Sequence, residues 1–162
     1  MDQKTLREVL SYDQSTGVFT WKKHRCSTLV GKQCGNTHHT GYIRISIKKK
    51  SYLAHRLAWI YMHGELSGEI DHVNGIKNDN RIGNLRIASR SQNLANKKLR
   101  KDNKAGLKGV FLVDKIKKNR WRASICVGGK NKYLGSFVTP EEAHETYCAA
   151  ASKAFGDFFH AG

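Results

Sequence analysis

The chain has 162 residues and carries 29 Lys and Arg against 13 Asp and Glu, a formal net charge of +16. Apolar residues make up 39% of it and charged residues 26%, which is typical of a globular protein rather than of a disordered or fibrous one. It has no run of about 18 apolar residues, the length that a membrane span needs, and no signal-peptide apolar stretch near its N-terminus. We therefore expect one ordinary domain or two small ones in a protein that is neither secreted nor membrane-bound.

Residues 1–53 predict a short helix followed by strands. In residues 42–47, Ile alternates with Arg and Ser, which is the pattern of a half-buried strand. Three lysines at 48–50 lie at the tip of the expected hairpin. The apolar residues from 53 to 62 then recur at helical spacing, and Gly64 ends this predicted helix.

Residues 69–93 predict a hairpin-like excursion closed by a helix. The pair Asn74-Gly75 is a strong tight-turn signal. Ser89 and Gln92 have the spacing of a capping box, which starts a helix. The excursion is rich in Asp, Asn and His, which core packing does not explain.

A neutral imidazole beside oxygen ligands for a hard divalent cation is what phosphodiester hydrolysis requires. Carboxylate and amide oxygens favour Mg²⁺ or Mn²⁺ over zinc. On the residues alone, a polar turn with one exposed His is the competing interpretation.

Residues 97–108 contain almost no core residues and read as a linker. Beyond them, residues 109–113, 120–127 and 132–138 have the pattern of three strands, with Gly128-Gly129 as a turn. A helix is predicted to follow, because its start combines an N-cap, a proline in the first position and a capping box at residues 139–142. A face of small residues suits close packing of this helix on the sheet.

Most of the positive charge lies between Arg86 and Lys132, where 15 Lys and Arg face two acids, Asp102 and Asp114, a local net charge of +13. Such a block attracts a polyanion, and nucleic acid is the commonest one for a soluble protein. The competing explanations are a surface that serves solubility and a membrane-surface segment, which would need a long amphipathic helix. Charge therefore favours a nucleic-acid-binding protein.

The cysteines form no Cys-x-x-Cys pair, whereas structural zinc sites usually contain close ligand pairs. We expect four reduced cysteines in a cytosolic protein. The alternative that can be written down is a zinc site with the ligands Cys26, Cys34, His38 and His39.

Four motifs in residues 53–96 carry a resemblance to a known family. They are Ala54-His55-Arg56-Leu57-Ala58-Trp59, Ile70-Asp71-His72-Val73-Asn74-Gly75, Asp79-Asn80-Arg81-Ile82-Gly83-Asn84-Leu85-Arg86 and Ser91-Gln92-Asn93. In this order they resemble the HNH endonucleases, and in particular the homing-type branch of phages and mobile introns. The resemblance implies two β-strands and a helix around one metal ion, in a DNA endonuclease.

The resemblance also implies a role for each motif residue. His72 is the general base, and Asp71 and Asn93 are the ligands of one Mg²⁺ (or Mn²⁺) per active site. Asn84 braces the loop and helps to orient His72. Because the third motif letter is Asn rather than His, the neutral amide brings less charge to the metal, so we expect modest metal affinity. His55 is either an accessory residue of the site or a structural cap.

Residues 107–160 resemble a second family, the AP2 DNA-binding domain. The motifs are Lys108-Gly109-Val110, Trp121-Arg122-Ala123, Tyr133-Leu134-Gly135-Ser136-Phe137 and Glu141-Glu142-Ala143 with Tyr147 and Ala150-Ala151. The resemblance implies a three-stranded antiparallel sheet that lies in the major groove and is backed by one helix.

On the second strand of this sheet, the apolar residues from Trp121 to Val127 should face the helix, and the residues that alternate with them should face DNA: Arg120, Arg122, Ser124 and Cys126. Plant AP2 factors read bases with several arginines on the sheet. The comparable positions in this sequence are Phe111, Val113, Ser124 and Cys126. We therefore expect fewer arginine contacts to bases than in the plant factors.

We expect basic residues to contact DNA phosphates, which position a protein without specifying a sequence. For Arg56, Arg81 and Arg86, a solvated surface position is the equal alternative. The full set is Arg56, Arg81, Arg86, Lys97, Lys98, Arg100, Lys101, Lys108, Lys117, Lys118, Arg120, Arg122, Lys130 and Lys132.

The sequence thus predicts an α+β protein: a ββα-metal (HNH) nuclease domain followed by an AP2-like three-stranded antiparallel sheet plus one helix. Residues 1–53 are an N-terminal α/β extension that either touches DNA or only supports the fold. The nuclease core, the basic linker and the AP2-like domain are residues 54–98, 99–106 and 107–162.

The predicted activity is hydrolysis of phosphodiester bonds in double-stranded DNA, by a monomer or weak dimer with no membrane partner and no small-molecule cofactor. If phage-encoded, as the resemblance suggests, the protein acts in the cytoplasm of a bacterial host. The first alternative is a catalytically inactive, sequence-specific DNA-binding regulator. An RNA-binding protein is the second, and it would need exposed aromatic residues for stacking. The target sequence, and nicking against double-strand cleavage, stay open.

Overall fold

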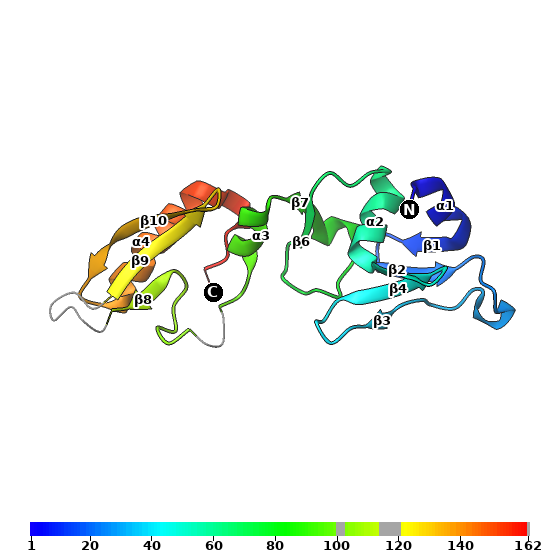
Figure 1. Cartoon of the computed structure of the whole chain (residues 1–162), viewed down its shortest axis with the longest axis horizontal. Helices are drawn as coiled ribbons and strands as arrows, with labels where there is room; N and C mark the ends of the chain where they lie inside the picture. Colours follow the sequence, from blue (N-terminus) through cyan, green and yellow to red (C-terminus); the bar gives the residue numbers. More distant parts are fainter. Residues whose placement is uncertain (100–102, 114–120, 162) are drawn as a thin grey trace. The chain divides into compact units, whose positions relative to one another are not determined.

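The computed structural model describes residues 1–99, 103–113 and 121–161, and shows a mixed α/β protein with several small antiparallel sheets (Figure 1). Its contacts divide the chain into two compact units, Met1–Ala88 and Ser89–Gly162, which are described one at a time. In the described part of the chain, no helix has both the length and the apolar character that crossing a membrane requires.

The first unit opens with helix α1 (Gln3–Val9) and the hairpin of β1 (Leu10–Asp13) and β2 (Val18–Trp21). The Asp13 carboxylate accepts hydrogen bonds from Ser15 and Thr16, so residues 13–17 form the turn. The short helix η1 (Ser27–Leu29) follows.

A second sheet has the strand order β3-β4-β5, with β3 at Asn36–Thr37, β4 at Ile43–Ile47 and β5 at Lys50–Leu53. Along β4 the predicted alternation is confirmed, since Ile45 and Ile47 are buried and their neighbours exposed. The predicted helix is also confirmed: α2 spans Ala54–His63 and ends at Gly64, whose φ of 88° favours glycine.

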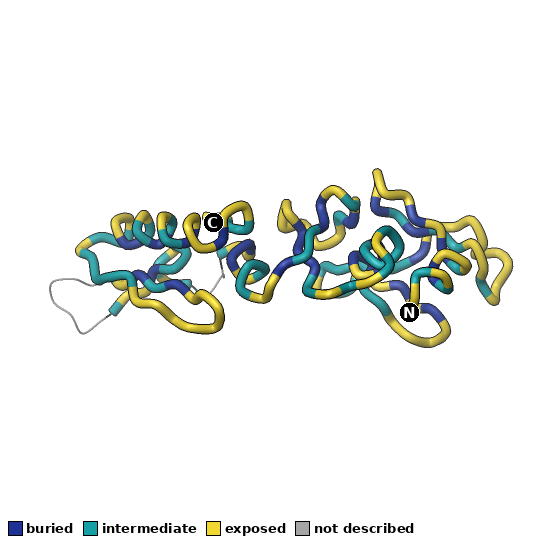
Figure 2. The backbone as a smooth tube through the Cα atoms, turned by 90° about the horizontal axis from the view of Figure 1, so that it is seen from above, coloured by how far each residue is buried: buried dark blue, intermediate teal, exposed yellow. Residues whose placement is uncertain are grey.

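The predicted excursion is a two-stranded ladder of β6 (Glu69–His72) and β7 (Leu85–Ala88), with the short helix η2 (Ile82–Asn84) before β7. Its inward-facing residues, Ile70 and Leu85, belong to the core of the first unit, which is formed by buried residues from α1, β1, β2, β4 and α2. Figure 2 shows buried and exposed residues following one another at short intervals along the backbone.

The second unit begins with α3 (Arg90–Asn96), which carries the predicted capping box between Ser89 and Gln92. The sequence predicts that the nuclease core ends at residue 98. The boundary between the two compact units lies ten residues earlier, at residue 88. The reason is packing: α3 contacts helix α4 and the short helix η3 of the same unit. As functional domains, residues 1–53, 54–98, 99–106 and 107–162 stay a prediction, and part of the linker lies outside the described residues.

The predicted succession of three strands and a helix is present in the second unit. The strands β8 (Val110–Leu112), β9 (Trp121–Val127) and β10 (Lys130–Phe137) form an antiparallel sheet in the order β10-β9-β8. They are followed by α4 (Pro140–Phe155) and η3 (Gly156–Phe158).

Helix α4 packs on β9, and their contact forms the core of the second unit. Ala123 and Ile125 of β9 are buried against it, as predicted. Val127 is instead 41% exposed, because it is the last residue before the turn at Gly128-Gly129. On α4 the buried face is formed by Ala143, Tyr147, Ala151 and Phe155.

The close packing of Gly109 on Tyr147 yields a stability prediction. Gly109 has a φ of 75°, and a Cβ at this position would fall within the Tyr147 ring. We expect Gly109→Ala to lower the free energy of unfolding by about 2–4 kcal/mol, from left-handed backbone strain together with overpacking. Chemical denaturation would measure this loss.

The matched control is Gly128→Ala, because Gly128 also has a positive φ, 59°, but no atom lies within 4 Å of the place that an alanine methyl group would take. This variant should lose only the backbone contribution, about 1 kcal/mol. Equal losses for the two variants would contradict the packing argument.

Candidate nuclease site

His72, the last residue of β6, is buried with two aromatic neighbours from other elements. It is 5% exposed, and its ring meets that of His55 of α2 edge-on, with centroids 5.0 Å apart. The Tyr42 ring lies 5.1 Å from His55 and 6.0 Å from His72. Strand β6, helix α2 and the segment before β4 thus converge on one imidazole pair.

Burial keeps both imidazoles neutral near pH 7. It is the main cause that lowers the pKa of His72, and the hydrogen bond with Asn80 acts in the opposite direction. For His55, burial and then the neighbouring His72 lower the pKa to about 3. His55 Nδ1 is buried without a hydrogen-bond partner among the described residues. A neutral imidazole has a lone pair that accepts a proton, which is the property that a general base needs.

Asp71 precedes His72 and is buried beside Arg86, its partner across the β6–β7 ladder. Arg86 Nε and an Arg86 terminal nitrogen lie 2.9 and 2.8 Å from Asp71 Oδ2. The structure therefore places the Arg86 guanidinium on the predicted metal ligand. Its predicted phosphate contact stays a prediction.

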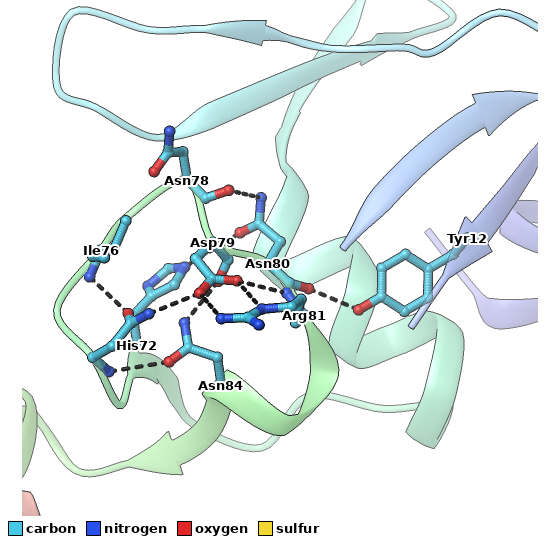
Figure 3. Close-up of polar contacts among 9 residues, drawn as sticks. Tyr12, His72, Ile76, Asn78, Asp79, Asn80, Arg81 and Asn84 are labelled. Atoms are coloured by element: carbon cyan, nitrogen blue, oxygen red, sulfur yellow. Dashed lines mark hydrogen bonds and ion pairs between the residues drawn. The ribbon is translucent and has the colours of Figure 1, made fainter. Parts of the chain in front are cut away.

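Asn84 spans the loop that connects β6 to β7 (Figure 3). Its Oδ1 accepts a hydrogen bond from Asn74 N at 3.0 Å, and its Nδ2 donates to the Asp79 carbonyl at 2.8 Å. The Asn84 carbonyl also accepts a hydrogen bond from Val73 N at 2.9 Å. These contacts agree with the bracing role expected for Asn84, and its part in catalysis stays a prediction.

Asp79 ties the same loop together at a second point. Its carboxylate accepts hydrogen bonds from Asn74 Nδ2 at 2.7 Å and from the Arg81 guanidinium at 2.8 and 2.6 Å. The Arg81 contacts are the main reason why the pKa of Asp79 falls to about 2. Arg81, predicted to contact phosphate, is thus engaged within the loop, although its side chain is largely exposed.

Asn80 is the site residue to which sequence reasoning assigned no role. Its Oδ1 lies 3.2 Å from His72 Nε2, and only 1% of the residue is exposed. No periodicity marks it, because it is one of several polar residues in an irregular return. Its importance follows from the loop geometry, which brings residue 80 back onto residue 72.

Asn93 lies in α3 and thus in the second unit, so the structure describes it separately from His72. Its role as a metal ligand stays a prediction. Within the described ranges, no three His, Cys, Asp or Glu side chains gather as a metal-binding group. A buried carboxylate next to a neutral imidazole nevertheless suits Mg²⁺, which often takes one or two protein carboxylates and completes its coordination with water and phosphate.

The zinc alternative has no support in the described residues. Cys26 is exposed, whereas Cys34 is buried, and burial raises the pKa of the Cys34 thiol to about 12. His38 Nδ1 contacts Thr40 Oγ1 at 2.9 Å. All four cysteines are free thiols.

Most of the described basic residues that were predicted to contact DNA are exposed: Arg56, Arg81, Lys97, Lys98, Arg122, Lys130 and Lys132. The Arg122 guanidinium lies over the ring of Tyr133, 5.5 Å from its centroid. The register places Lys132 opposite Ile125, on the α4 side of the sheet. Outside the described residues lie Arg100, Lys101, Lys117, Lys118 and Arg120.

Lys108 differs from this set, because its ammonium group is used within the fold. Its Nζ donates hydrogen bonds to the carbonyls of Ala95, Lys97 and His160 at 2.5, 2.7 and 2.7 Å. Desolvation lowers its pKa. An ammonium group has three N–H donors, and the three carbonyls use all of them. A phosphate contact by Lys108 stays a prediction, and it would require breaking one of these hydrogen bonds.

The buried His55 yields a prediction for acid stability. Above about pH 6.5 the folded and the unfolded chain both hold this residue neutral. Between pH 6.5 and about 3, the unfolded chain binds a proton that folded His55 does not bind, so the free energy of unfolding falls by up to about 1.4 kcal/mol per pH unit.

His55→Phe should make this fall less steep, as measured by urea unfolding at several pH values. His63→Phe, which changes an exposed histidine of the same helix, should leave the slope unchanged. A slope that is the same in all three proteins would mean that His55 does not resist protonation.

Comparisons with known proteins find similarity to HNH endonucleases. Residues 52–95 match the family model of the HNH endonucleases. Over 107 residues the chain is 32% identical to a protein of Acanthamoeba polyphaga mimivirus that is named an uncharacterized HNH endonuclease, and the match covers 64% of this chain and 54% of the relative. The chain therefore spans about half the length of this relative. No solved structure matches this chain.

The matched segment runs from β5 to α3 and contains His55, Asp71, His72, Asn84 and Asn93. The part of the chain that carries the His72 site is thus similar to HNH endonuclease domains.

Proposed function

We propose that this protein is a DNA endonuclease that hydrolyses phosphodiester bonds with His72 as the general base. The observation that carries the proposal is the buried, neutral imidazole of His72, directly after the buried Asp71 in β6, inside the segment that matches the HNH family. In this role His72 removes a proton from the water that attacks the phosphorus. Asn84 keeps the loop after His72 in place through its contacts with Asn74 and Asp79.

The proposed cofactor is Mg²⁺ or Mn²⁺, one ion per site, held by Asp71 and Asn93. When bound, the ion neutralises the scissile phosphate and the departing 3′ oxygen. Arg86 would then contribute by holding the Asp71 carboxylate in one orientation through its two short contacts.

The second unit is proposed to hold the DNA in an AP2-like manner, as in a homing-type enzyme. Along β9, Arg122, Ser124 and Cys126 alternate with the buried Ala123 and Ile125. They therefore lie on the sheet face that points away from α4, and this face supports the proposal. The register sets Phe111 of β8 opposite Arg122, and Tyr133 of β10 opposite Ser124. This face therefore combines a cation with two exposed aromatic rings, on a strongly basic chain.

Those two rings also favour a second candidate, a protein that binds single-stranded nucleic acid. Phe111 is 53% exposed and Tyr133 57%, and bases stack on such rings regardless of sequence. The tryptophans, in contrast, are at least partly buried. Competition between duplex DNA and single-stranded RNA would separate the two candidates. An inactive DNA-binding regulator remains the alternative to cleavage, and a phage or bacterial setting is proposed only from the homing-type resemblance, since the matched relative is from a mimivirus.

Cleavage of supercoiled plasmid with Mg²⁺ or Mn²⁺ tests the proposed activity. Relaxed or linear product should form with the wild-type chain and disappear with EDTA. His72→Ala should lower the rate by about 10²–10⁴-fold, the usual contribution of a general base. His63→Ala removes an exposed histidine from the same unit and should cut at the wild-type rate.

Product that persists in His72→Ala would show that another group is the base. If no DNA substrate is cut while salt-sensitive DNA binding is retained, the regulator alternative is correct.

The dependence of DNA affinity on salt tests the role of the second unit. If 6–10 phosphates are contacted, affinity should fall by roughly three to five decades between 50 and 200 mM salt. Arg122→Gln should make the plot of log affinity against log salt shallower by about one unit. Lys153→Gln, on the exposed side of α4, should not change the plot. Equal slopes for the two variants would place the DNA away from the sheet.

A further inference from the structure

The amide of Asn80 determines which nitrogen of His72 carries the proton. An amide oxygen only accepts hydrogen bonds, and Asn80 Oδ1 lies 3.2 Å from His72 Nε2. A neutral imidazole has one N–H and one lone-pair nitrogen, and the hydrogen bond made by one nitrogen sets the state of the other. The contact therefore requires a proton on Nε2 and leaves the lone pair on Nδ1.

The amide itself has little freedom to turn. Asn80 is almost fully buried, and its Nδ2 lies 3.4 Å from the Asn78 carbonyl, which is an acceptor. Rotation by 180° would bring the amide NH₂ group to His72 and the amide oxygen to a carbonyl oxygen. The Nε2–H form of His72 is thus the one that satisfies both contacts of the Asn80 side chain.

The backbone of Asn80 is held by the N-terminal hairpin of β1 and β2. The Tyr12 hydroxyl of β1 donates a hydrogen bond to the Asn80 carbonyl at 2.7 Å, as Figure 3 shows. Gly17, in the hairpin turn, packs so closely on residue 80 that a Cβ there would lie 2.5 Å from the Asn80 carbonyl carbon. Ile82 N also donates to the Gln14 carbonyl at 3.2 Å. Three residues of one hairpin therefore fix the chain at residues 80–82.

We propose that Asn80 is a positioning residue that holds His72 in the Nε2–H tautomer, and that the β1–β2 hairpin keeps Asn80 in place through Tyr12. This inference rests on the proposed function only for its consequence in catalysis. Residues 1–53 would then have a third role besides supporting the fold or touching DNA, because their hairpin positions a residue that contacts His72.

In the reaction, His72 Nδ1 takes one proton from the attacking water, and the imidazolium formed keeps its Nε2–H on Asn80 Oδ1. The water oxygen forms the new bond to phosphorus while the bond from phosphorus to the 3′ oxygen breaks. The departing oxygen takes a proton from bulk water, and the remaining phosphate stays on the 5′ side.

Histidine ¹⁵N and ¹³C shifts report the tautomer directly, without DNA or metal. The full chain would be labelled on histidine and measured near pH 8, above the ordinary pKa of His of about 6.5. The His72 signals are identified by their loss in His72→Gln. We expect the wild type to show Nε2–H, Asn80→Asp to keep it because a carboxylate also accepts, and Asn80→Ala to show a substantial Nδ1–H fraction.

Cleavage kinetics provide the second readout. Asn80→Ala should lower kcat at least tenfold with KM little changed. When the lone pair lies on Nε2 instead of Nδ1, proton transfer from water is slowed, but DNA binding is not affected. Tyr12→Phe should lower kcat several-fold and raise the Nδ1–H fraction. Tyr61→Phe is the matched control, because its ring packs on that of Tyr12 with centroids 5.6 Å apart, and it should change neither quantity.

A wild-type spectrum of the Nδ1–H form would overturn the proposal, as would a tautomer that stays the same in Asn80→Ala and Tyr12→Phe. Should Asn80→Ala fail to fold, the wild-type spectrum and Tyr12→Phe decide. A chain that cuts no DNA but shows the expected tautomers would refute the proposed function and leave the positioning of His72 by Asn80 standing.

Discussion

A buried imidazole needs a partner for its N–H, because an unpaired polar group inside a protein costs about 1–3 kcal/mol. Meeting this need for His72 determines much of the first unit. Asn80 accepts from the ring, Asn84 spans the loop that brings residue 80 back to residue 72, and Tyr12 secures the carbonyl of Asn80 from another sheet. His55 differs, since its buried Nδ1, a polar atom whether or not it carries the proton, has no hydrogen-bond partner within the described part of the chain. The unit tolerates this cost at the point where the two histidine rings meet.

Charge is handled differently in the two units. In the first, the acids near His72 are each paired with an arginine, Asp71 with Arg86 and Asp79 with Arg81. The Arg81 contacts lower the pKa of Asp79, and the Arg86 contacts hold the buried Asp71 carboxyl group in place. In the second unit the sheet face opposite α4 has Arg122 beside exposed rings. These two acids near His72 are therefore each held by an arginine of the same unit, and the exposed Arg122 of the second unit is available to a polyanion.

Local signals in the sequence were enough to predict the order of the elements. The alternation in residues 43–47, the glycine that ends α2, the capping box of α3 and the Gly128-Gly129 turn all act over a few residues, and each is found as expected. The contacts of Asn80, Arg86 and Lys108 were not predictable in this way. Each depends on a residue brought close by the fold, and an Asn, Arg or Lys looks the same in a sequence whether its partner is water, DNA or a buried carbonyl. The packing of α3 on α4 and η3 depends on the fold in the same way, whereas the predicted functional domains stay a prediction.

Lys108 has a consequence for the end of the chain. Its ammonium joins the last turn of α3 at Ala95 and Lys97 to the carbonyl of His160, so three segments far apart in sequence meet on one nitrogen. His160 is thereby held on the second unit by the same ammonium group that contacts α3. Without the His160 carbonyl the desolvated Lys108 ammonium would have one acceptor fewer, so the position of this carbonyl and the packing of α3 depend on the same side chain.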